Sequence, residues 1–333
     1  MHKPVAALAL TSAAALVLAG CAGTPAAESA SDGITVVAST NVYGSIAAQI
    51  GGDRVEVTSL IENVAQDPHS YEASARDRLT VKNADLVIEN GGGYDSFIDT
   101  LLQDADDPAV VTAVEFSHDF PGNEGHEAEE EHAEHADETE HEEEHAEEGH
   151  DHEGHDHIEG FNEHVWFDPH TMVHVVEAIA DELAELDPEG KAGFEAAAAD
   201  LVTELEGFEA DLETLKTDAA GASVFMTEPL PGYLAAAAGL TDVTPEGFAE
   251  SVEEGSDVSP ATLLAALDVI EAGDVRAVLT NAQTGGAETE RVEEAAKAAG
   301  IPVVAFTELL EDGSSYAEWM RDGIQSLADA VTS

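Results

Sequence analysis

The chain has 333 residues, with 71 aspartates and glutamates against 11 lysines and arginines, so its formal net charge is −60 at pH 7. This composition excludes a nucleic-acid-binding protein, because no basic surface is available to neutralise phosphates. It also argues against electrostatic binding to an anionic membrane, and it makes a cation the natural ligand. The length suffices for two domains, each with its own core.

The N-terminal segment has the pattern of an export signal. A short basic start is followed by an apolar run and by Leu18-Ala19-Gly20-Cys21, which predicts a signal peptide over residues 1–20. Leu-Ala-Gly-Cys also resembles the bacterial lipobox, and this resemblance implies lipidation of Cys21. The small, polar residues 21–32 are typical of a tether. We therefore expect an extracytoplasmic lipoprotein on the outer face of the cell membrane, held only by its lipid anchor, with plain secretion as the alternative.

Short apolar runs alternate with helical segments after this tether. The predicted strands are 34–38, 55–61, 84–88 and 110–114, and a helix is expected over 43–50. Strands separated by helical segments are typical of a parallel α/β sheet. The sequence therefore predicts an N-terminal α/β lobe over residues 33–187.

An acidic, histidine-rich stretch interrupts this lobe and is predicted as a disordered loop over residues 122–160. Nine of the 15 histidines and 18 of the 71 acidic residues lie between Glu124 and Glu159, so the stretch cannot build a core. Imidazole and carboxylate are ligands of Zn²⁺, and a histidine at every third or fourth position favours metal capture over a plain acidic linker. The predicted auxiliary metal-binding histidines are His126, His132, His135, His141, His145, His150, His152, His155 and His157.

The second half of the chain begins with a long amphipathic pattern. Large apolar side chains recur at spacings of three, four and seven over residues 188–217, which predicts a long connecting helix. The alternation of strands and helices then resumes, so a C-terminal α/β lobe is predicted over residues 218–333. Its expected strands are 222–226, 277–279 and 301–306, and its expected helices are 232–238 and 315–331.

Three segments carry metal-competent side chains next to predicted strand ends. They read QDPHSYE from Gln66, NEHVWFDP from Asn162 and FMTEP from Phe225. Open α/β sheets place their ligand sites at such strand ends. A single histidine in a loop is usually a surface residue, but the histidine-rich stretch and the extracytoplasmic address favour metal ligation here.

These segments resemble the zinc/manganese solute-binding lipoproteins of ABC transporters over essentially the whole mature chain. The motif DPHSYE implies a metal-binding role for His69, and HVWFDP implies the same role for His164. The spacing from Glu228 to Tyr233 is similar to that after the family's third ligand. The resemblance implies a monomer with two parallel α/β lobes joined by one long rigid helix, and a metal site in the cleft between the lobes.

The fourth ligand departs from the family pattern, which has an aspartate shortly after the last strand. Glu308 is the best positional match, Asp312 is the alternative, and water is a third possibility. Two imidazoles with one or two carboxylates suit four-coordinate Zn²⁺, whereas Mn²⁺ prefers more oxygen ligands. The histidine-rich stretch favours zinc, so Zn²⁺ is the predicted ligand and Mn²⁺ the alternative.

The resemblance predicts a lipoprotein that captures Zn²⁺ and delivers it to the permease and ATPase subunits of an ABC importer. A surface metal-buffering protein or adhesin without a transport role is an alternative. A zinc hydrolase is another, since His141-Glu-Glu-Glu-His145 matches H-E-x-x-H. That motif needs a helix with an apolar face, which this charged stretch lacks, so we expect no enzyme.

Overall fold

The computed structural model describes residues 33–123, 158, 160–311 and 313–333. The predicted signal peptide, the tether with Cys21, the nine auxiliary histidines and Asp312 lie outside the described residues. Among the described residues, no helix combines the length and the apolar composition that crossing a membrane requires.

The first lobe is built on a four-stranded parallel sheet. Its strands are β1 (Ile34–Thr40), β2 (Val55–Ile61), β3 (Leu86–Glu89) and β4 (Ala109–Thr112), in the order β2-β1-β3-β4. The central strands β1 and β3 are almost wholly buried, because helices cover both faces of the sheet. This burial explains why both strands are largely apolar in sequence.

The second lobe repeats this topology. Its strands are β5 (Ser223–Met226), β6 (Thr241–Asp242), β7 (Val275–Asn281) and β8 (Val303–Phe306), in the order β6-β5-β7-β8 and all parallel. Counted from the first strand of each lobe, the two orders are identical. Loops that follow corresponding strands therefore leave each sheet at corresponding places.

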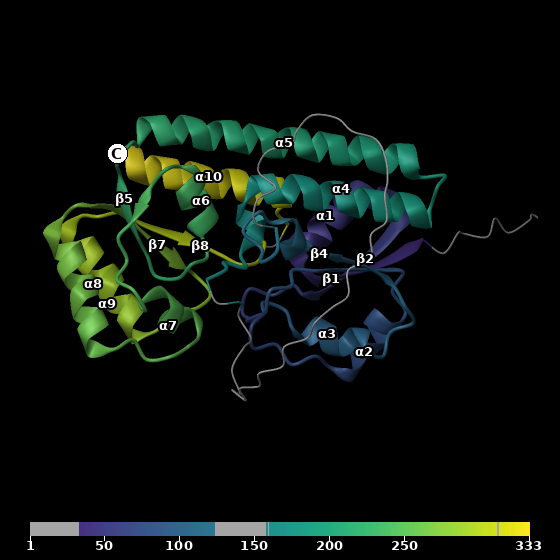
Figure 1. The fold of residues 1–333 in the computed structure, drawn as a ribbon, viewed down its shortest axis with the longest axis horizontal. Coiled ribbons are helices and arrows are strands. Elements are labelled where there is room, and N and C mark those ends of the chain that lie inside the picture. The colour runs from purple at the N-terminus through teal and green to yellow at the C-terminus, as the bar shows by residue number, and fades with distance from the viewer. Residues whose placement is uncertain (1–32, 124–157, 159, 312) are drawn as a thin grey trace, which may run out of the picture. The chain divides into compact units, whose positions relative to one another are not determined.

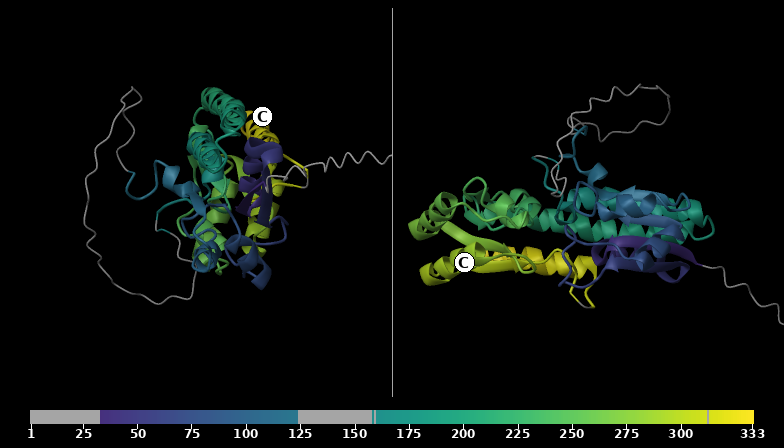
Figure 2. Two further views of the ribbon diagram at one scale, coloured as in Figure 1. Left: turned by 90° about the vertical axis from the view of Figure 1, so that its right-hand side faces the viewer. Right: turned by 90° about the horizontal axis from the view of Figure 1, so that it is seen from below.

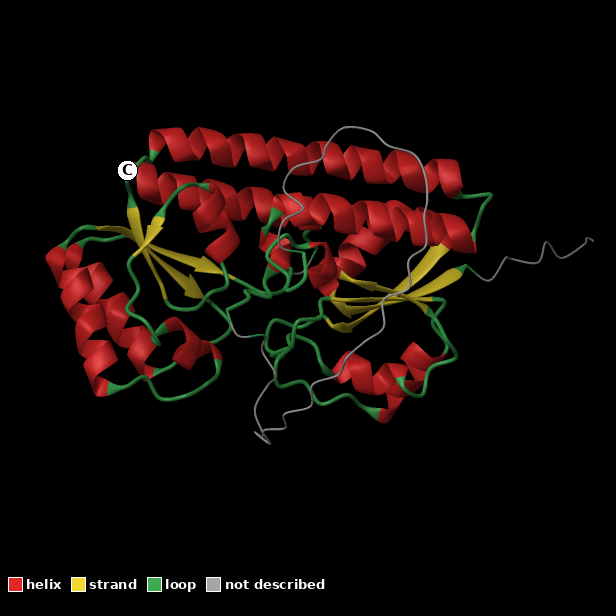
Figure 3. Ribbon diagram, viewed as in Figure 1, coloured by secondary structure: helices red, strands yellow, loops and turns green. Residues whose placement is uncertain are grey.

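Helices flank both sheets, as the colouring in Figure 3 shows. They are α1 (Asn41–Gly51), α2 (Ala75–Lys82), α3 (Phe97–Leu102), α4 (Pro169–Leu186), α5 (Lys191–Asp218), α6 (Gly232–Ala237), α7 (Ala249–Glu253), α8 (Pro260–Ala272), α9 (Ala287–Ala299) and α10 (Tyr316–Thr332). Asp168 caps α4 by accepting hydrogen bonds from the backbone N–H groups of His170 and Thr171, and Pro169 occupies the first turn. This cap fixes the point at which the chain turns from the His164 segment into α4.

The long helix α5 runs past both lobes, which lie side by side along it (Figures 1 and 2). It packs against α1 and α4 from the first lobe and against α6 and α10 from the second. Its buried face consists of Phe194, Ala198, Leu201, Leu205, Phe208, Leu212 and Leu215. These residues belong to one apolar core that includes strands of both sheets, so the two lobes share a continuous packed layer on this side.

The opposite faces of the two sheets have separate cores. In the first lobe, α2 and α3 cover a small cluster around Val37, Val87 and Leu101. In the second lobe, α8 and α9 cover a cluster around Phe225, Val278 and Val292. The two lobes therefore share one core on the α5 side of the sheets and have separate cores on the opposite side.

The structure confirms the predicted fold class of two parallel α/β lobes with flanking helices, and it changes several boundaries. The strand expected over 110–114 ends at Thr112, because the chain turns there into a 3₁₀ helix over Ala113–Phe116. The long helix begins at Lys191, after a turn in which Asp187 accepts hydrogen bonds from the backbone. The lobe boundaries proposed from the sequence stay a prediction.

Candidate metal centre

The predicted metal ligands all lie in loops that follow the carboxyl ends of strands. His69 follows β2 and His164 comes after β4, so both histidines belong to the first lobe. Glu228 follows β5 and Glu308 follows β8, so both carboxylates belong to the second lobe. Carboxyl ends of parallel strands open on the same side of a sheet, which is where α/β proteins hold their ligands.

A tight turn positions His69. Its backbone N–H donates to Oδ1 of Asp67 at 2.9 Å, and the hydroxyl of Ser70 donates to the other oxygen of the same carboxylate at 2.8 Å. The imidazole stands edge-on to the ring of Tyr94, with centroids 4.9 Å apart. The ring of His164 lies 6.2 Å away, so the structure brings together two histidines that are 95 positions apart in the chain.

His164 is buried and its ring is oriented by Asn162. Nδ1 of His164 lies 2.7 Å from Oδ1 of Asn162, which also accepts the backbone N–H of His164. The amide nitrogen of Asn162 donates to the carbonyl of Pro229, so Oδ1 is the acceptor and Nδ1 of the imidazole carries the proton. Nε2 then bears the lone pair of the neutral ring and is the atom able to ligate a metal.

The two second-lobe carboxylates are joined by one amide. The side-chain nitrogen of Asn281 donates to Oε2 of Glu228 at 2.8 Å and to Oε1 of Glu308 at 2.7 Å. Thr284 donates its hydroxyl to the remaining oxygen of Glu228, and Tyr94 donates to that of Glu308 at 3.2 Å. Both glutamates are buried. Tyr94 comes from the first lobe, so its hydroxyl links the two walls of the site.

Within the described residues, two groups of side chains bring potential ligand atoms within 4.8 Å of one another. One group is His69, His164 and Glu253, and the other is Asp67, His69 and Glu308. The structure thus brings three of the four predicted ligands into these groups, while Glu228 is in neither. Asp67 and Glu253 are not among the ligands predicted from the sequence.

Burial dominates the electrostatics of the second-lobe carboxylates. It raises the pKa of Glu308 to about 7, with the nearby charge of Glu228 adding to the rise. Burial likewise raises the pKa of Glu253 to about 9, with further contributions from Glu163, Glu228 and Glu308. Burial also raises the pKa of Glu228. Carboxylates gathered away from water attract a cation, because a bound positive charge offsets both their desolvation and their mutual repulsion.

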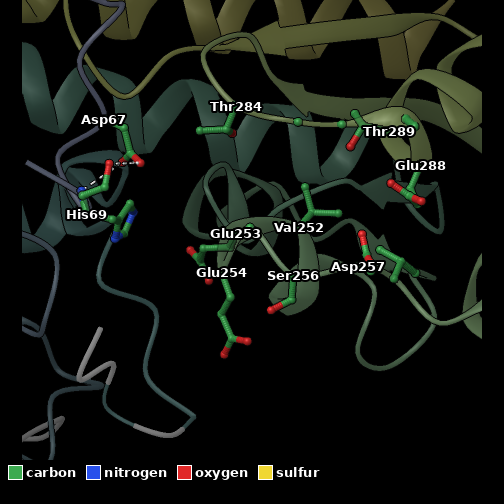
Figure 4. Close-up of a pocket in the computed structure, with 16 residues that line it drawn as sticks. Asp67, His69, Val252, Glu253, Glu254, Ser256, Asp257, Thr284, Glu288 and Thr289 are labelled. Carbon is green, nitrogen blue, oxygen red and sulfur yellow. Dashed lines mark hydrogen bonds between the residues drawn. The ribbon is translucent and has the colours of Figure 1, made fainter. Parts of the chain in front are cut away.

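A cavity of about 640 Å³ opens beside these residues. Asp67, His69 and Ser70 form its first-lobe wall, and residues 252–258 with 284–289 form the second-lobe wall. Figure 4 shows Asp67 and His69 on one side of this cavity and Glu253 and Glu254 on the side facing them. An ion that entered here would meet the imidazole of His69 and the carboxylate of Asp67 on one wall and further carboxylates on the other.

Hydrogen bonds hold the two walls in register. Asn162 of the first lobe donates to Pro229, and its carbonyl accepts from the hydroxyl of Tyr233 at 2.8 Å. Asn41, the first residue of α1, exchanges hydrogen bonds with the backbone of Leu310, both at 3.0 Å. The aromatic side chains of Trp166 and Phe167 are buried next to His164, as expected for residues that fix its loop.

The fold and its donors define a class of two-lobed proteins in which parallel α/β lobes face each other across a mixed nitrogen and oxygen site. The sequence profile of the family described as zinc-uptake complex component A, periplasmic (ZnuA), matches residues 36–330. Because this match covers most of the 333 residues, the chain belongs to that family. The family consists of uptake components and is not a class of enzymes.

Known relatives bear names that refer to two metals. The chain is 25% identical over 177 residues to the manganese-binding lipoprotein MntA of Halalkalibacterium halodurans, covering 53% of this chain and 48% of the relative. It is 26% identical over 246 residues to the zinc-binding lipoprotein AdcA of Streptococcus pneumoniae, covering 74% of this chain and 45% of the relative. The chain therefore spans about half the length of these curated relatives.

A solved structure shares the fold. The periplasmic zinc-binding protein TroA from Treponema pallidum is similar with a TM-score of 0.68 at 18% sequence identity, covering 90% of this chain and 100% of that chain. At this identity, the similarity concerns the fold, and it agrees with the two repeated parallel sheets described above.

Proposed function

We propose that this protein is the substrate-binding lipoprotein of an ABC-type importer, which captures Zn²⁺ outside the cytoplasmic membrane and delivers it to permease and ATPase subunits. The observation that carries this proposal is the meeting of His69 and His164 with buried carboxylates of the other lobe beside one cavity. The family's description as a zinc-uptake component supports it, and so do the metal-binding names of the relatives.

Each wall of the cleft has a distinct task in this proposal. His69 and His164 contribute neutral nitrogen ligands, and Asn162 holds the second of them in the tautomer that ligates through Nε2. Glu308 contributes negative charge that offsets the divalent ion, and the sequence prediction adds Glu228 as a further ligand. Zinc is the transported substrate here, so the protein needs to bind it tightly and still release it.

The zinc ion can be released because its proposed ligands are divided between the two lobes. A small separation of the second-lobe carboxylates from the first-lobe histidines removes half of the coordination shell at once. The shared core along α5 limits this separation to small displacements. We propose that docking on the importer supplies the free energy for this displacement and so lowers the zinc affinity of the site.

The histidine-rich stretch is proposed to collect zinc at many weak sites and to raise its concentration near the cleft. The nine closely spaced histidines of this stretch support this role. Deletion of residues 125–157 is expected to lower the number of zinc ions bound per chain and to preserve the tightest site. Zinc titration by calorimetry tests this, and loss of the tightest site on deletion would contradict the two-tier arrangement.

Metal competition on the loop-deleted mature protein tests the proposed function. The protein is offered equimolar Zn²⁺ and Mn²⁺, and the bound metal is identified by native mass spectrometry and calorimetry. One tightly held zinc ion per chain, lost in His69→Ala, is the expected result. The absence of any tight site would make the protein a metal buffer rather than a delivery protein.

Manganese is the second candidate substrate. The oxygen-rich second-lobe wall and the similarity to a manganese-binding lipoprotein both favour it. Retention of Mn²⁺ against equimolar Zn²⁺ would establish manganese as the substrate and leave the proposed importer partners unchanged. A cell-surface adhesion role without transport predicts instead that metal uptake is normal in cells that lack the protein.

A further inference from the structure

We propose that Asn281 limits each of the carboxylate ligands Glu228 and Glu308 to one metal-binding oxygen, and that it thereby sets the preference of the cleft between Zn²⁺ and Mn²⁺. This inference rests on the proposed function, in which both glutamates are ligands. Asn281 does not touch the ion in this proposal. It is a positioning residue that acts through the two carboxylates.

The order of the strands places Asn281 between the two glutamates. Glu228 follows β5 and Glu308 follows β8, and β7 lies between these two strands in the order β6-β5-β7-β8. Asn281 is the last residue of β7 and is buried, and its side chain contacts both carboxylates. A substitution at this one position therefore affects both carboxylates at once.

The amide of Asn281 uses both of its hydrogens in this position. Its nitrogen donates to Oε2 of Glu228 at 2.8 Å and to Oε1 of Glu308 at 2.7 Å. Its oxygen accepts the backbone N–H of Gln283 at 2.9 Å, so the nitrogen and not the oxygen faces the carboxylates. One neutral side chain thus bridges two groups that would otherwise repel each other when ionised.

Gln283, two residues further along the same loop, holds the main chain of Glu308. Its Oε1 accepts the backbone N–H of Glu308 at 2.6 Å and that of Leu309 at 3.0 Å. The loop after β7 therefore fixes Glu308 by both its side chain and its backbone. Glu228 belongs to neither group of converging ligand atoms, but the bridge joins it to Glu308, which belongs to one of them.

The bridge restricts the number of oxygens that the two carboxylates can offer to an ion. A carboxylate binds a metal through one oxygen or through both, and binding through both requires both oxygens to face the ion. The oxygen that accepts a hydrogen from Asn281 has a lone pair engaged and is held toward the amide, so the carboxylate cannot turn both oxygens to the ion without breaking that bond. One oxygen from each carboxylate and one nitrogen from each of His69 and His164 make four ligands.

This limit on carboxylate oxygens favours zinc over manganese. Four ligands of mixed nitrogen and oxygen suit Zn²⁺, whereas Mn²⁺ prefers more oxygen ligands and a higher coordination number. Specificity is a difference between two affinities, so a residue that withholds oxygens from the ion disfavours manganese relative to zinc. Loss of the Asn281 bridge should therefore cost zinc affinity and shift the preference of the cleft toward manganese.

The test measures the Zn²⁺ and Mn²⁺ affinities of the full mature chain, of Asn281→Ala and of the matched control Thr284→Val. Thr284 lies in the same loop and donates to the other oxygen of Glu228, so Thr284→Val removes a donor from one carboxylate and leaves the bridge in place. Affinities are measured by competition with a chelator at half an equivalent of metal, so that only the tightest site is loaded. The visible absorption of the Co²⁺-loaded proteins reports the coordination number, because four-coordinate Co²⁺ absorbs much more strongly than six-coordinate Co²⁺.

We expect Asn281→Ala to weaken zinc binding by about 10-fold, as is typical of residues that orient ligands, and to weaken manganese binding less. The ratio of the two affinities should shift toward manganese, and the Co²⁺ absorption should lose intensity. Thr284→Val should leave the ratio and the spectrum close to those of the unaltered protein. An unchanged ratio or an unchanged spectrum in Asn281→Ala overturns the inference, as does an equal shift of the ratio in Thr284→Val.

Two further variants separate this inference from the proposed function. If Asn281→Ala keeps the ratio and the spectrum while His69→Ala loses the tight site, the inference fails and the metal cleft stands. If His69→Ala also keeps the tight site, the proposed function fails. Should Asn281→Ala not fold, as judged by circular dichroism of the metal-free protein, Asn281→Ser replaces it. A hydroxyl has one hydrogen and cannot bridge both carboxylates, so the same shift is expected, and an unchanged ratio in Asn281→Ser overturns the inference.

Discussion

The two lobes have the same strand order and contribute different chemistry to the cleft. The first lobe supplies imidazoles from the loops after β2 and β4, and the second supplies carboxylates from the loops after β5, β6 and β8. Topology therefore determines where ligands can lie, and the loop sequences determine which atoms they offer. In the proposed function, neither lobe can hold the ion alone.

The two lobes also differ in the hydrogen bonds made by two corresponding asparagines near the site. The third strand of each lobe is followed or closed by an asparagine, Asn90 in the first lobe and Asn281 in the second. The amide of Asn90 donates to the carbonyl of Glu163, next to His164, whereas the amide of Asn281 donates to two carboxylates. The corresponding amides thus hold backbone in place in the first lobe and carboxylates in the second.

Removal of a first-lobe histidine should have the largest effect on the site. His69 belongs to both groups of potential ligands, so His69→Ala is expected to weaken the tightest zinc site by about 1,000-fold or more, beyond the 10- to 100-fold typical of supporting residues. Chelator competition at substoichiometric zinc measures the change. The exposed His174 on α4 provides the control, since His174→Ala should leave the tightest site unchanged. Equal losses in the two variants would contradict the assignment of His69.

A second-lobe carboxylate should affect metal preference as well as affinity. Glu308→Gln is expected to weaken zinc binding by about 10- to 100-fold and manganese binding by more, because Mn²⁺ depends more on charged oxygen ligands. Parallel titrations with Zn²⁺ and Mn²⁺ give the ratio of the two losses. The exposed Glu311 serves as control in Glu311→Gln. Equal losses for both metals would show that the carboxylate wall does not set the preference.

The tautomer of His164 should have a smaller effect. Asn162→Ala removes the acceptor of the Nδ1 proton and is expected to weaken zinc binding by about 10-fold, since the ring is then free to reorient. Asn162→Asp keeps an acceptor at the same place and should retain more of the affinity. Tyr233→Phe removes only the hydroxyl that donates to the Asn162 carbonyl, so it controls for loss of contact between the lobes. A Tyr233→Phe loss as large as that of Asn162→Ala would contradict the tautomer explanation.

The sequence reveals the first-lobe half of the site more readily than the second-lobe half. His69 and His164 are the histidines of the short motifs DPHSYE and HVWFDP, and their neighbours Asp67, Trp166 and Phe167 hold their loops in place. Local sequence therefore carries most of that geometry. The buried runs of β1 and the apolar face of α5 likewise predict the fold, because burial on both faces or along one stripe leaves a periodic signal.

Glu253 illustrates why the second-lobe half of the site is difficult to predict from the sequence. It stands in the segment AESVEEGSD among three other acidic residues, and nothing local distinguishes the buried carboxylate from its exposed neighbours. The strand that defines its position, β6, has only two residues, both exposed, and so gives no apolar signal. A search for this residue would have to match the loops of the second lobe to those of the first, which requires the sheet order.

The smallest expected effect concerns stability and not metal binding. It arises from a residue that differs between the two lobes. Glu89 precedes Asn90 in the first lobe, at the place where the second lobe has Thr280 before Asn281. Burial raises the pKa of Glu89 to about 8, with the charge of Asp95 adding to the rise. The unfolded chain loses this proton near the ordinary pKa of about 4.3, whereas the folded chain keeps it until about pH 8. Between these values the unfolded state binds fewer protons, so stability falls as pH rises.

Glu89→Gln should therefore flatten the decline in stability of the metal-free protein between pH 5 and 8. One such group contributes at most about 1.4 kcal/mol per pH unit to the slope, and the amide has no proton to lose. Urea denaturation at pH 5, 6, 7 and 8 measures the slope, with the exposed Glu56→Gln as the control. A slope that Glu89→Gln leaves unchanged would mean that the decline originates elsewhere, in Asp95 and the buried carboxylates of the second-lobe wall, whose pKa values burial also raises. Those carboxylates titrate in the same direction, so the residual slope of Glu89→Gln reports their share.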